Sequence, residues 1–81
     1  MTREDIFAVI TAERARQEKL AYDGNIPFTC AWCAISGGDK VTVLTEELGE
    51  VARAVQERDD VQLRTELTQL AACCCAWLEA L

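Results

Sequence analysis

Histidine is absent from this chain, and proline occurs only once. Without an imidazole ligand, a zinc site would have to be built from thiolates and carboxylates alone. With one proline and a hydrophobic content of 51%, the chain does not have the composition of a disordered protein. No stretch approaches the ~20 apolar residues that a membrane-spanning helix requires. The composition therefore predicts a folded chain that does not cross a membrane.

Positive charge is also scarce, with 8 Lys and Arg against 14 Asp and Glu and a net charge of −6. This balance argues against a nucleic-acid backbone or an anionic membrane as the main partner. It leaves open small anions that arrive together with divalent cations. The first residues, MTREDIF, are charged, and no long apolar run follows, so no signal peptide is expected. We expect a soluble, cytoplasmic protein with neither nucleic acid nor membrane as a partner.

The five cysteines are odd in number, and three of them are adjacent at 73–75. This pattern favours reduced thiols over a secreted disulfide framework. Cys30 and Cys33 form a CxxC pair, which is half of a zinc site or a thiol–disulfide motif. Zinc would need two more ligands, and redox CxxC pairs usually follow a strand, which is not evident here. A zinc or redox module is therefore kept as an alternative.

The length of 81 residues allows one domain, which we expect to span 1–81. A domain this small buries roughly 60% of the surface of its unfolded chain, so a lone core is marginal. Such chains usually need a disulfide, a metal or a partner subunit. We therefore expect one of these additions.

A first helix is predicted from about residue 3 to 21. Thr2 followed by Asp5 resembles a capping box, in which each side chain binds a backbone N–H group of the first turn. Residues 22–39 then form a long connection, because they hold most of the residues that break helices. These are Asp23, Gly24, Asn25, Pro27, Gly37 and Gly38.

Asp39 is the predicted N-cap of a second helix that runs to about Arg58. Asp59 or Asp60 then caps a third helix over about 61–81. Because the link is so short, these two helices are predicted to form an antiparallel hairpin. The expected fold is all-α with three helices, and the hairpin is expected to pack into an oligomeric bundle.

Each helix of the hairpin carries an apolar stripe at helical spacing, which predicts its core face. The stripes comprise Leu44, Leu48, Val51, Ala52 and Val55 on one helix, and Leu63, Leu67, Leu70, Cys74, Trp77, Leu78 and Leu81 on the other.

Acidic residues lie beside these stripes. Glu47 and Glu50 are predicted on a flank that faces another helix, whereas Glu46 faces water. Glu66 and Gln69 occupy the same position relative to the stripe of the third helix, and residues three apart share a helix face. Carboxylates so close repel one another unless a positive charge compensates them. Hard Mg²⁺ is the simplest compensation, and an ordinary solvated face is the alternative.

The run EELGE at 46–50, followed after a short turn by ELTQ at 66–69, resembles the MazG-like all-α nucleotide pyrophosphohydrolases. The signature of that family is an ExxE pair on one helix and an ExxD pair on the next. The text around these motifs, over 40–57 and 63–81, resembles a small single-domain branch of the family, as does ERARQEK at 13–19. The resemblance covers most of the chain except the connection between the first two helices.

The resemblance implies Mg²⁺-dependent cleavage of a nucleoside triphosphate to a monophosphate and pyrophosphate, with Mn²⁺ as a possible substitute. By position, Glu47, Glu50, Glu66 and Gln69 would hold the metal, and Glu50 is the candidate proton acceptor. Members of the family assemble as dimers or tetramers, so a homodimer or homotetramer is expected.

Several other residues are candidates for substrate binding. Lys40, Arg16 and Lys19 are the main candidates for phosphate contacts, with Arg14 as a further one. Trp32 or Phe28 is a candidate for stacking on the base.

Gln69 departs from the family signature, which has Asp at this position. An amide oxygen can ligate Mg²⁺ but brings no negative charge, so we expect weaker binding of the metal. Glu46 or Glu13 would then supply the missing carboxylate. The alternative function is that of a catalytically degenerate MazG-like protein with an oligomerisation or regulatory role.

Overall fold

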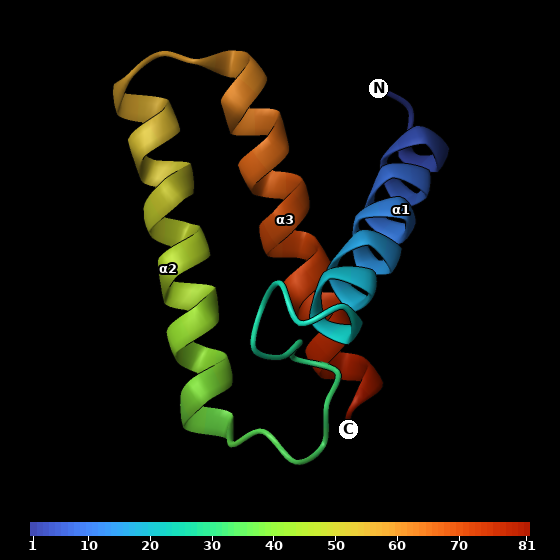
Figure 1. The fold of residues 1–81 in the computed structure, drawn as a ribbon. Coiled ribbons are helices and arrows are strands. Elements are labelled where there is room, and N and C mark those ends of the chain that lie inside the picture. The colour runs from blue at the N-terminus through green and yellow to red at the C-terminus, as the bar shows by residue number, and fades with distance from the viewer.

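The structure, a computed structural model that describes residues 1–81, consists of three helices and no strand. The helices are α1 (Arg3–Tyr22), α2 (Gly37–Gln56) and α3 (Asp60–Glu79) (Figure 1). The prediction of an all-α fold with three helices is confirmed.

The capping box at the start of α1 is present as predicted. The Asp5 N–H donates to Thr2 Oγ1 at 3.1 Å, and the Thr2 N–H donates to Asp5 Oδ2 at 3.1 Å. Two of the N–H groups that a helix leaves unpaired at its start are thus satisfied. The helix continues to Tyr22, one residue beyond the predicted end.

The helix α2 begins earlier than predicted, because Ser36 and not Asp39 is its N-cap. The Asp39 N–H donates to Ser36 Oγ at 3.1 Å, so Asp39 lies in the first turn. There its charge is favourable, because the N-terminal end of a helix dipole is positive. Gly37 and Gly38 were predicted to break the chain, but they form the first helical positions, whose N–H groups lack intrahelical partners in any case.

The turn between α2 and α3 is longer than predicted, because α2 ends at Gln56 and not near Arg58. Arg58 adopts a left-handed conformation with φ of 53°. Asp59 then caps α3 by accepting a hydrogen bond from the Gln62 N–H at 3.0 Å. The two helices run antiparallel and pack closely, as Figure 1 shows, so the predicted hairpin is confirmed.

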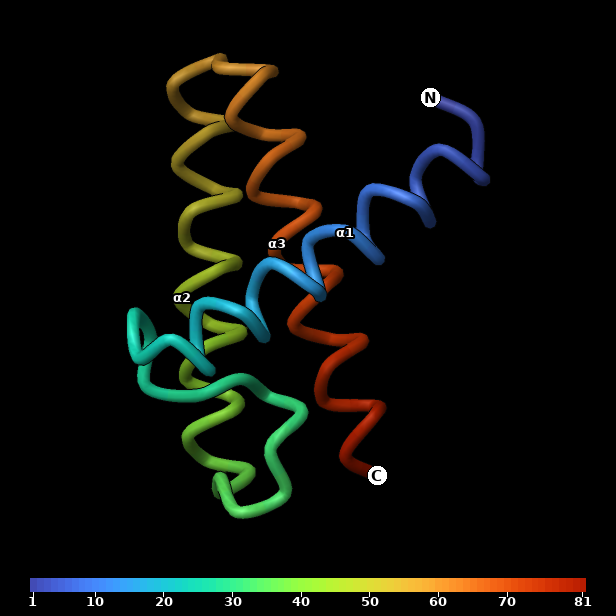
Figure 2. The backbone as a smooth tube through the Cα atoms, turned by 45° about the vertical axis from the view of Figure 1, so that its right-hand side comes forward, coloured from blue at the N-terminus to red at the C-terminus, as the bar shows by residue number.

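The helix α3 is central, because it contacts both α1 and α2, which do not contact each other. Figures 1 and 2 agree that the N-terminal half of α1 turns away from the hairpin. The loop of residues 23–36, here called the connecting loop, crosses from α1 to α2 at the other end (Figure 2).

The prediction of the core face is confirmed only in part for the single chain, where Leu44, Leu63 and Leu70 are half-buried. Leu48, Leu67 and Leu78 of the predicted stripes are 57%, 48% and 69% exposed. The buried apolar residues of the hairpin are all small, and most of them belong to the flank that carries the acids: Ala54, Ala72, Cys73 and Ala76. Small side chains let two helices approach closely, which explains why this flank faces inward.

None of the three helices combines the length and the apolar character that crossing a membrane would require.

Candidate functional site

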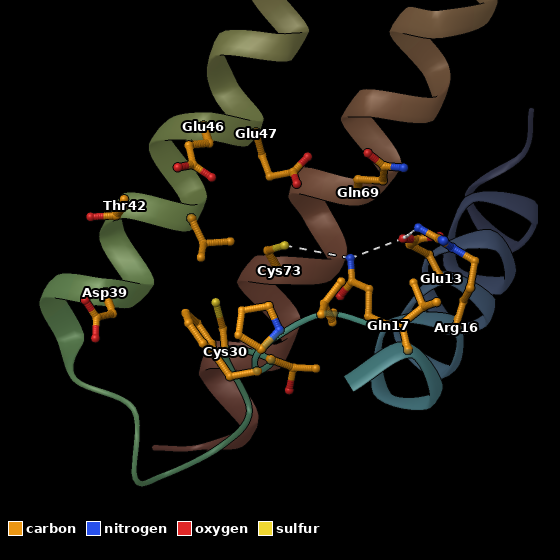
Figure 3. A pocket seen from close by; sticks show the side chains of 16 residues that line it. Glu13, Arg16, Gln17, Cys30, Asp39, Thr42, Glu46, Glu47, Gln69 and Cys73 are labelled. Carbon is orange, nitrogen blue, oxygen red and sulfur yellow. Dashed lines mark hydrogen bonds and ion pairs between the residues drawn. The ribbon is translucent and has the colours of Figure 1, made fainter. Parts of the chain in front are cut away.

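A cavity of about 470 Å³ lies between α1 and α2 (Figure 3). The connecting loop forms its lower wall in this view, and α3 contributes the two residues at its back. Sixteen residues line it: Glu13, Arg16, Gln17, Leu20, Ile26, Pro27, Phe28, Thr29, Cys30, Asp39, Thr42, Val43, Glu46, Glu47, Gln69 and Cys73. The glutamates therefore gather at one end of the cavity, whereas Asp39 lies towards the other end and the loop side is largely apolar.

Among the carboxylates that line the cavity, that of Glu47 has a raised pKa and an oxygen without a hydrogen-bond partner. Glu47 is half-buried, and the unpaired oxygen is its buried Oε2 atom. Burial raises the pKa of Glu47 above its usual value, and the charges of Glu66, Glu50, Glu13 and Glu46 raise the pKa further. The free energy of a negative charge at this position is thus unfavourable in the isolated chain.

The four predicted metal ligands do not all face one cavity. Glu47 and Gln69 line it, and Figure 3 shows them on facing helices at its upper end. Glu66 is buried in α3, where its Oε1 accepts a hydrogen bond of 2.6 Å from Gln62 Nε2. Glu50 is exposed and lines a second groove, which also includes Gln62, near the turn between α2 and α3.

The side chains fit a hydrated Mg²⁺ site better than a dry cage of protein ligands. No three His, Cys, Asp or Glu side chains are close enough to hold an ion among them. Mg²⁺ keeps several water molecules in most proteins and needs only one or two carboxylates. The unpaired, buried Oε2 atom of Glu47 is an oxygen of the kind such an ion binds.

A polar chain of side chains joins α1 to α3 along one side of the cavity. Arg16 donates from Nε and Nη2 to the two oxygens of Glu13 at 2.7 and 2.8 Å. The Nε2 group of Gln17 donates to Glu13 Oε2 at 3.2 Å and to Cys73 Sγ at 3.7 Å. The hydrogen bond from Arg16 to Glu13 raises the pKa of Arg16, so its guanidinium stays charged beside the acids.

Three of the predicted substrate-binding residues lie outside the cavity lining. Lys40 is buried near the start of α2. Lys19 is exposed and pairs with Asp23 at 2.7 Å. Trp32 donates from Nε1 to Glu18 at 3.2 Å, so its indole N–H fastens the connecting loop to α1. Arg16 and Phe28 are the two predicted substrate contacts that line the cavity.

All five cysteines are free thiols, and the CxxC pair is divided between two environments. Cys30 is buried and lines the cavity, whereas Cys33 is exposed, with its Sγ 3.9 Å from the Ala80 carbonyl oxygen. Cys73 also lines the cavity, and burial raises the pKa of its thiol to about 12. The two cavity thiols are therefore protonated and poorly nucleophilic at neutral pH.

Several residues of the site have no signal in the sequence. The loop residues 26–30 reach the cavity because the connecting loop folds back, which local patterns do not reveal. Gln17 and Gln62 look like ordinary polar helix residues, although each binds a glutamate of the site. Glu13 was predicted only as a substitute ligand.

Comparison with known proteins does not assign the chain to a family. No protein-family model, no curated protein and no solved structure matches the chain.

Proposed function

We propose that this chain is a Mg²⁺-dependent nucleoside triphosphate pyrophosphohydrolase, which releases a nucleoside monophosphate and pyrophosphate. One observation carries the proposal: a half-buried carboxylate, Glu47, has an unpaired oxygen and faces a cavity of about 470 Å³. Burial raises its pKa, as do the charges of four other glutamates, and a divalent cation would relieve that repulsion. The resemblance of EELGE and ELTQ to the MazG-like signature supports the same reaction.

The proposed cation is Mg²⁺, with Mn²⁺ as a substitute, held directly or through water by Glu47 and Gln69, which line the cavity. Glu50 and Glu66 are further candidate ligands that would act through bound water. When bound, the ion would neutralise phosphate charge and lower the pKa of a water molecule. Gln69 contributes an oxygen without a negative charge, so we expect weaker binding than a site with four carboxylates would give.

The side chains of this protein suggest how a nucleotide would lie. Arg16 is charged and lines the acidic end of the cavity, where it is placed to meet a phosphate oxygen. Glu50 is exposed, and we propose that it accepts the proton of the attacking water. The apolar loop residues Ile26, Pro27 and Phe28 offer a surface for the base. The sequence offered Phe28 and Trp32 as candidates for stacking on the base. In this arrangement we propose Phe28, because it lines the cavity and Trp32 does not.

We also propose that the active form is a homodimer or homotetramer. One side of the hairpin exposes large apolar side chains, which are those of Leu48, Val55, Leu67 and Leu78. No large side chain is fully buried in the single chain. A second copy that covers this side would supply the missing core.

A purified-protein assay tests the proposed reaction. The protein is incubated with Mg²⁺ and each common ribo- and deoxyribonucleoside triphosphate, and the release of pyrophosphate is followed. We expect turnover of at least one nucleotide and its loss in Glu47→Gln. The control is Glu4→Gln, which makes the same chemical change at an exposed position of α1. Absence of turnover with every nucleotide, in Mg²⁺ and in Mn²⁺, would refute the proposal.

Gln69 favours one alternative, a degenerate homologue that binds nucleotide without cleaving it and serves as an oligomerisation or regulatory protein. Under this alternative, the wild-type protein binds Mg²⁺ and nucleotide but releases no pyrophosphate. Gln69→Asp would then tighten Mg²⁺ binding and create turnover. A cytoplasmic location remains a further proposal, which cell fractionation tests.

A further inference from the structure

The carboxylate of Glu18 lies where α1, the connecting loop and the end of α3 meet. It accepts hydrogen bonds from Thr29 Oγ1, from Arg14 Nη2 at 2.8 Å and from Trp32 Nε1 at 3.2 Å. Arg14 in turn donates from Nε to Glu79 of α3 at 2.6 Å. One side chain of α1 thus holds the loop at two points and is itself tied to α3.

The residues beside these two anchor points form a wall of the cavity. Thr29 is buried, and it lines the cavity together with its neighbours Phe28 and Cys30. The Ala31 N–H donates to Thr29 Oγ1 at 3.3 Å, which fixes the backbone beyond the wall. The loop has no helix or strand of its own, so its position depends on anchors of this kind.

The anchor residue stands outside the acidic end of the cavity. Figure 3 shows Glu46, Glu47 and Gln69 at the upper end and Cys30 on the loop at the lower end. Glu18 does not line the cavity. Burial acts to raise the pKa of Glu18, but hydrogen bonds from Thr29, Arg14 and Trp32 outweigh burial and lower that pKa. The anchor is therefore ionised at neutral pH.

We propose that Glu18 is a positioning residue that holds the connecting loop as the nucleoside-binding wall of the cavity. The inference rests on the proposed function, because it assigns the loop side to the base and sugar and the acidic side to the metal and phosphates. Glu18 then controls affinity for the nucleoside part of a substrate without touching it. The polyphosphate part is bound independently of Glu18.

Polyphosphate ligands with and without a nucleoside test this division. Calorimetry measures the binding of α,β-methylene analogues of ATP, GTP, CTP and UTP, and of tripolyphosphate, all with Mg²⁺. In Glu18→Gln the loop loses its charge-assisted hydrogen bonds, so affinity for the best-bound analogue falls about tenfold. Affinity for tripolyphosphate stays unchanged. Thr29→Val removes one hydrogen-bond donor to Glu18 and has the same selective effect.

The matched control is Asp23→Asn, which breaks the exposed ion pair with Lys19 at the start of the same loop. It leaves both affinities unchanged, since exposed pairs contribute little. Amide hydrogen exchange gives a readout without ligand: protection of residues 28–32 falls in Glu18→Gln, and protection of α2 and α3 is kept.

Three outcomes overturn the inference. An equal loss of both affinities would mean that Glu18 acts on the whole fold, and no loss of either would mean that the wall does not depend on it. If the wild-type protein binds neither the analogues nor tripolyphosphate, the proposed function fails and this inference fails with it. The first two outcomes leave the proposed function standing.

Discussion

At the scale of single residues, Glu47 is the position where folding and the proposed function conflict. Its Oε2 atom is buried without a partner, although an unpaired buried polar atom costs about 1–3 kcal/mol. Its pKa is raised by burial and by neighbouring glutamates. A residue that served only to stabilise the single chain would not be charged here, so Glu47 is better explained by a positive ligand.

The metal-free stability of Glu47→Gln should reveal this conflict. A raised pKa in the folded state means that the charged form destabilises the fold, and this effect is absent below the ordinary pKa of 4.5. It develops as the pH rises through the raised pKa. Without metal at pH 7, we expect Glu47→Gln to be more stable by about 1 kcal/mol, or about 4–8 °C in Tm.

Thermal unfolding in EDTA at several pH values measures this difference. The advantage of Glu47→Gln should shrink as the pH falls towards 4.5. A variant that is less stable than the wild type at pH 7 would show that Glu47 stabilises the fold by itself.

Sequence patterns identified only part of the site at this scale. Glu47 was predicted to be partly buried and Glu46 to be exposed, and both predictions are confirmed. Glu46 was expected to lie away from the flank of Glu47, but it lines the cavity together with Glu47, which is a correction. Glu50 was predicted to share the partly buried flank, but it is exposed, which is a correction. The helical wheel gives the angle of a residue around its axis, but it does not give how far the neighbouring helix extends along that axis.

At the scale of elements, helix ends follow local chemistry, and most of them could be predicted. Thr2 and Asp59 cap their helices as expected. A short polar side chain just before an apolar run can accept a hydrogen bond from a backbone N–H group of the first turn. Ser36 was missed because the two glycines after it suggested a break. Which of several adjacent polar residues becomes the cap depends on the path of the loop, and this is a tertiary property.

Arg58 offers a test of the turn between α2 and α3. It has a φ of 53°, a conformation that is strained for a residue with a side chain but natural for glycine after a helix end. We expect Arg58→Gly to raise the free energy of unfolding by about 0.5–1 kcal/mol. Urea denaturation measures the change, and Arg64→Gly, inside α3, is the contrast that should destabilise by about 1 kcal/mol. A loss of stability in Arg58→Gly would contradict the assigned turn.

At the scale of the whole molecule, the chain exposes more surface than a compact monomer of its mass. Its accessible surface is 5633 Å² at 9.0 kDa. Compact monomers of this mass expose roughly 4,850 Å². The excess, roughly 800 Å², is about what each partner buries in a stable interface. Periodicity located the apolar stripes, but it does not decide whether a stripe faces its own chain or another one.

Leu48→Glu tests whether a second copy covers the exposed stripe. Leu48 is 57% exposed in the single chain, so a glutamate there is tolerated by the monomer but not by a packed interface. We expect the wild type to sediment as a dimer or tetramer in analytical ultracentrifugation. Leu48→Glu should shift the distribution towards the monomer. Gln56→Glu adds the same charge at another exposed position of α2 and should leave assembly unchanged. A monomeric wild type would contradict the proposed assembly.

The most direct test of the central claim, that Glu47 belongs to a divalent-cation site, is a calorimetric Mg²⁺ titration of the purified protein. We predict saturable binding that tightens when an α,β-methylene nucleotide is present, because phosphate oxygens complete the coordination of the ion. Binding should weaken at least about tenfold in Glu47→Gln and stay unchanged in Glu4→Gln. Equal Mg²⁺ binding by the wild type and Glu47→Gln, or no binding by either, would contradict the account.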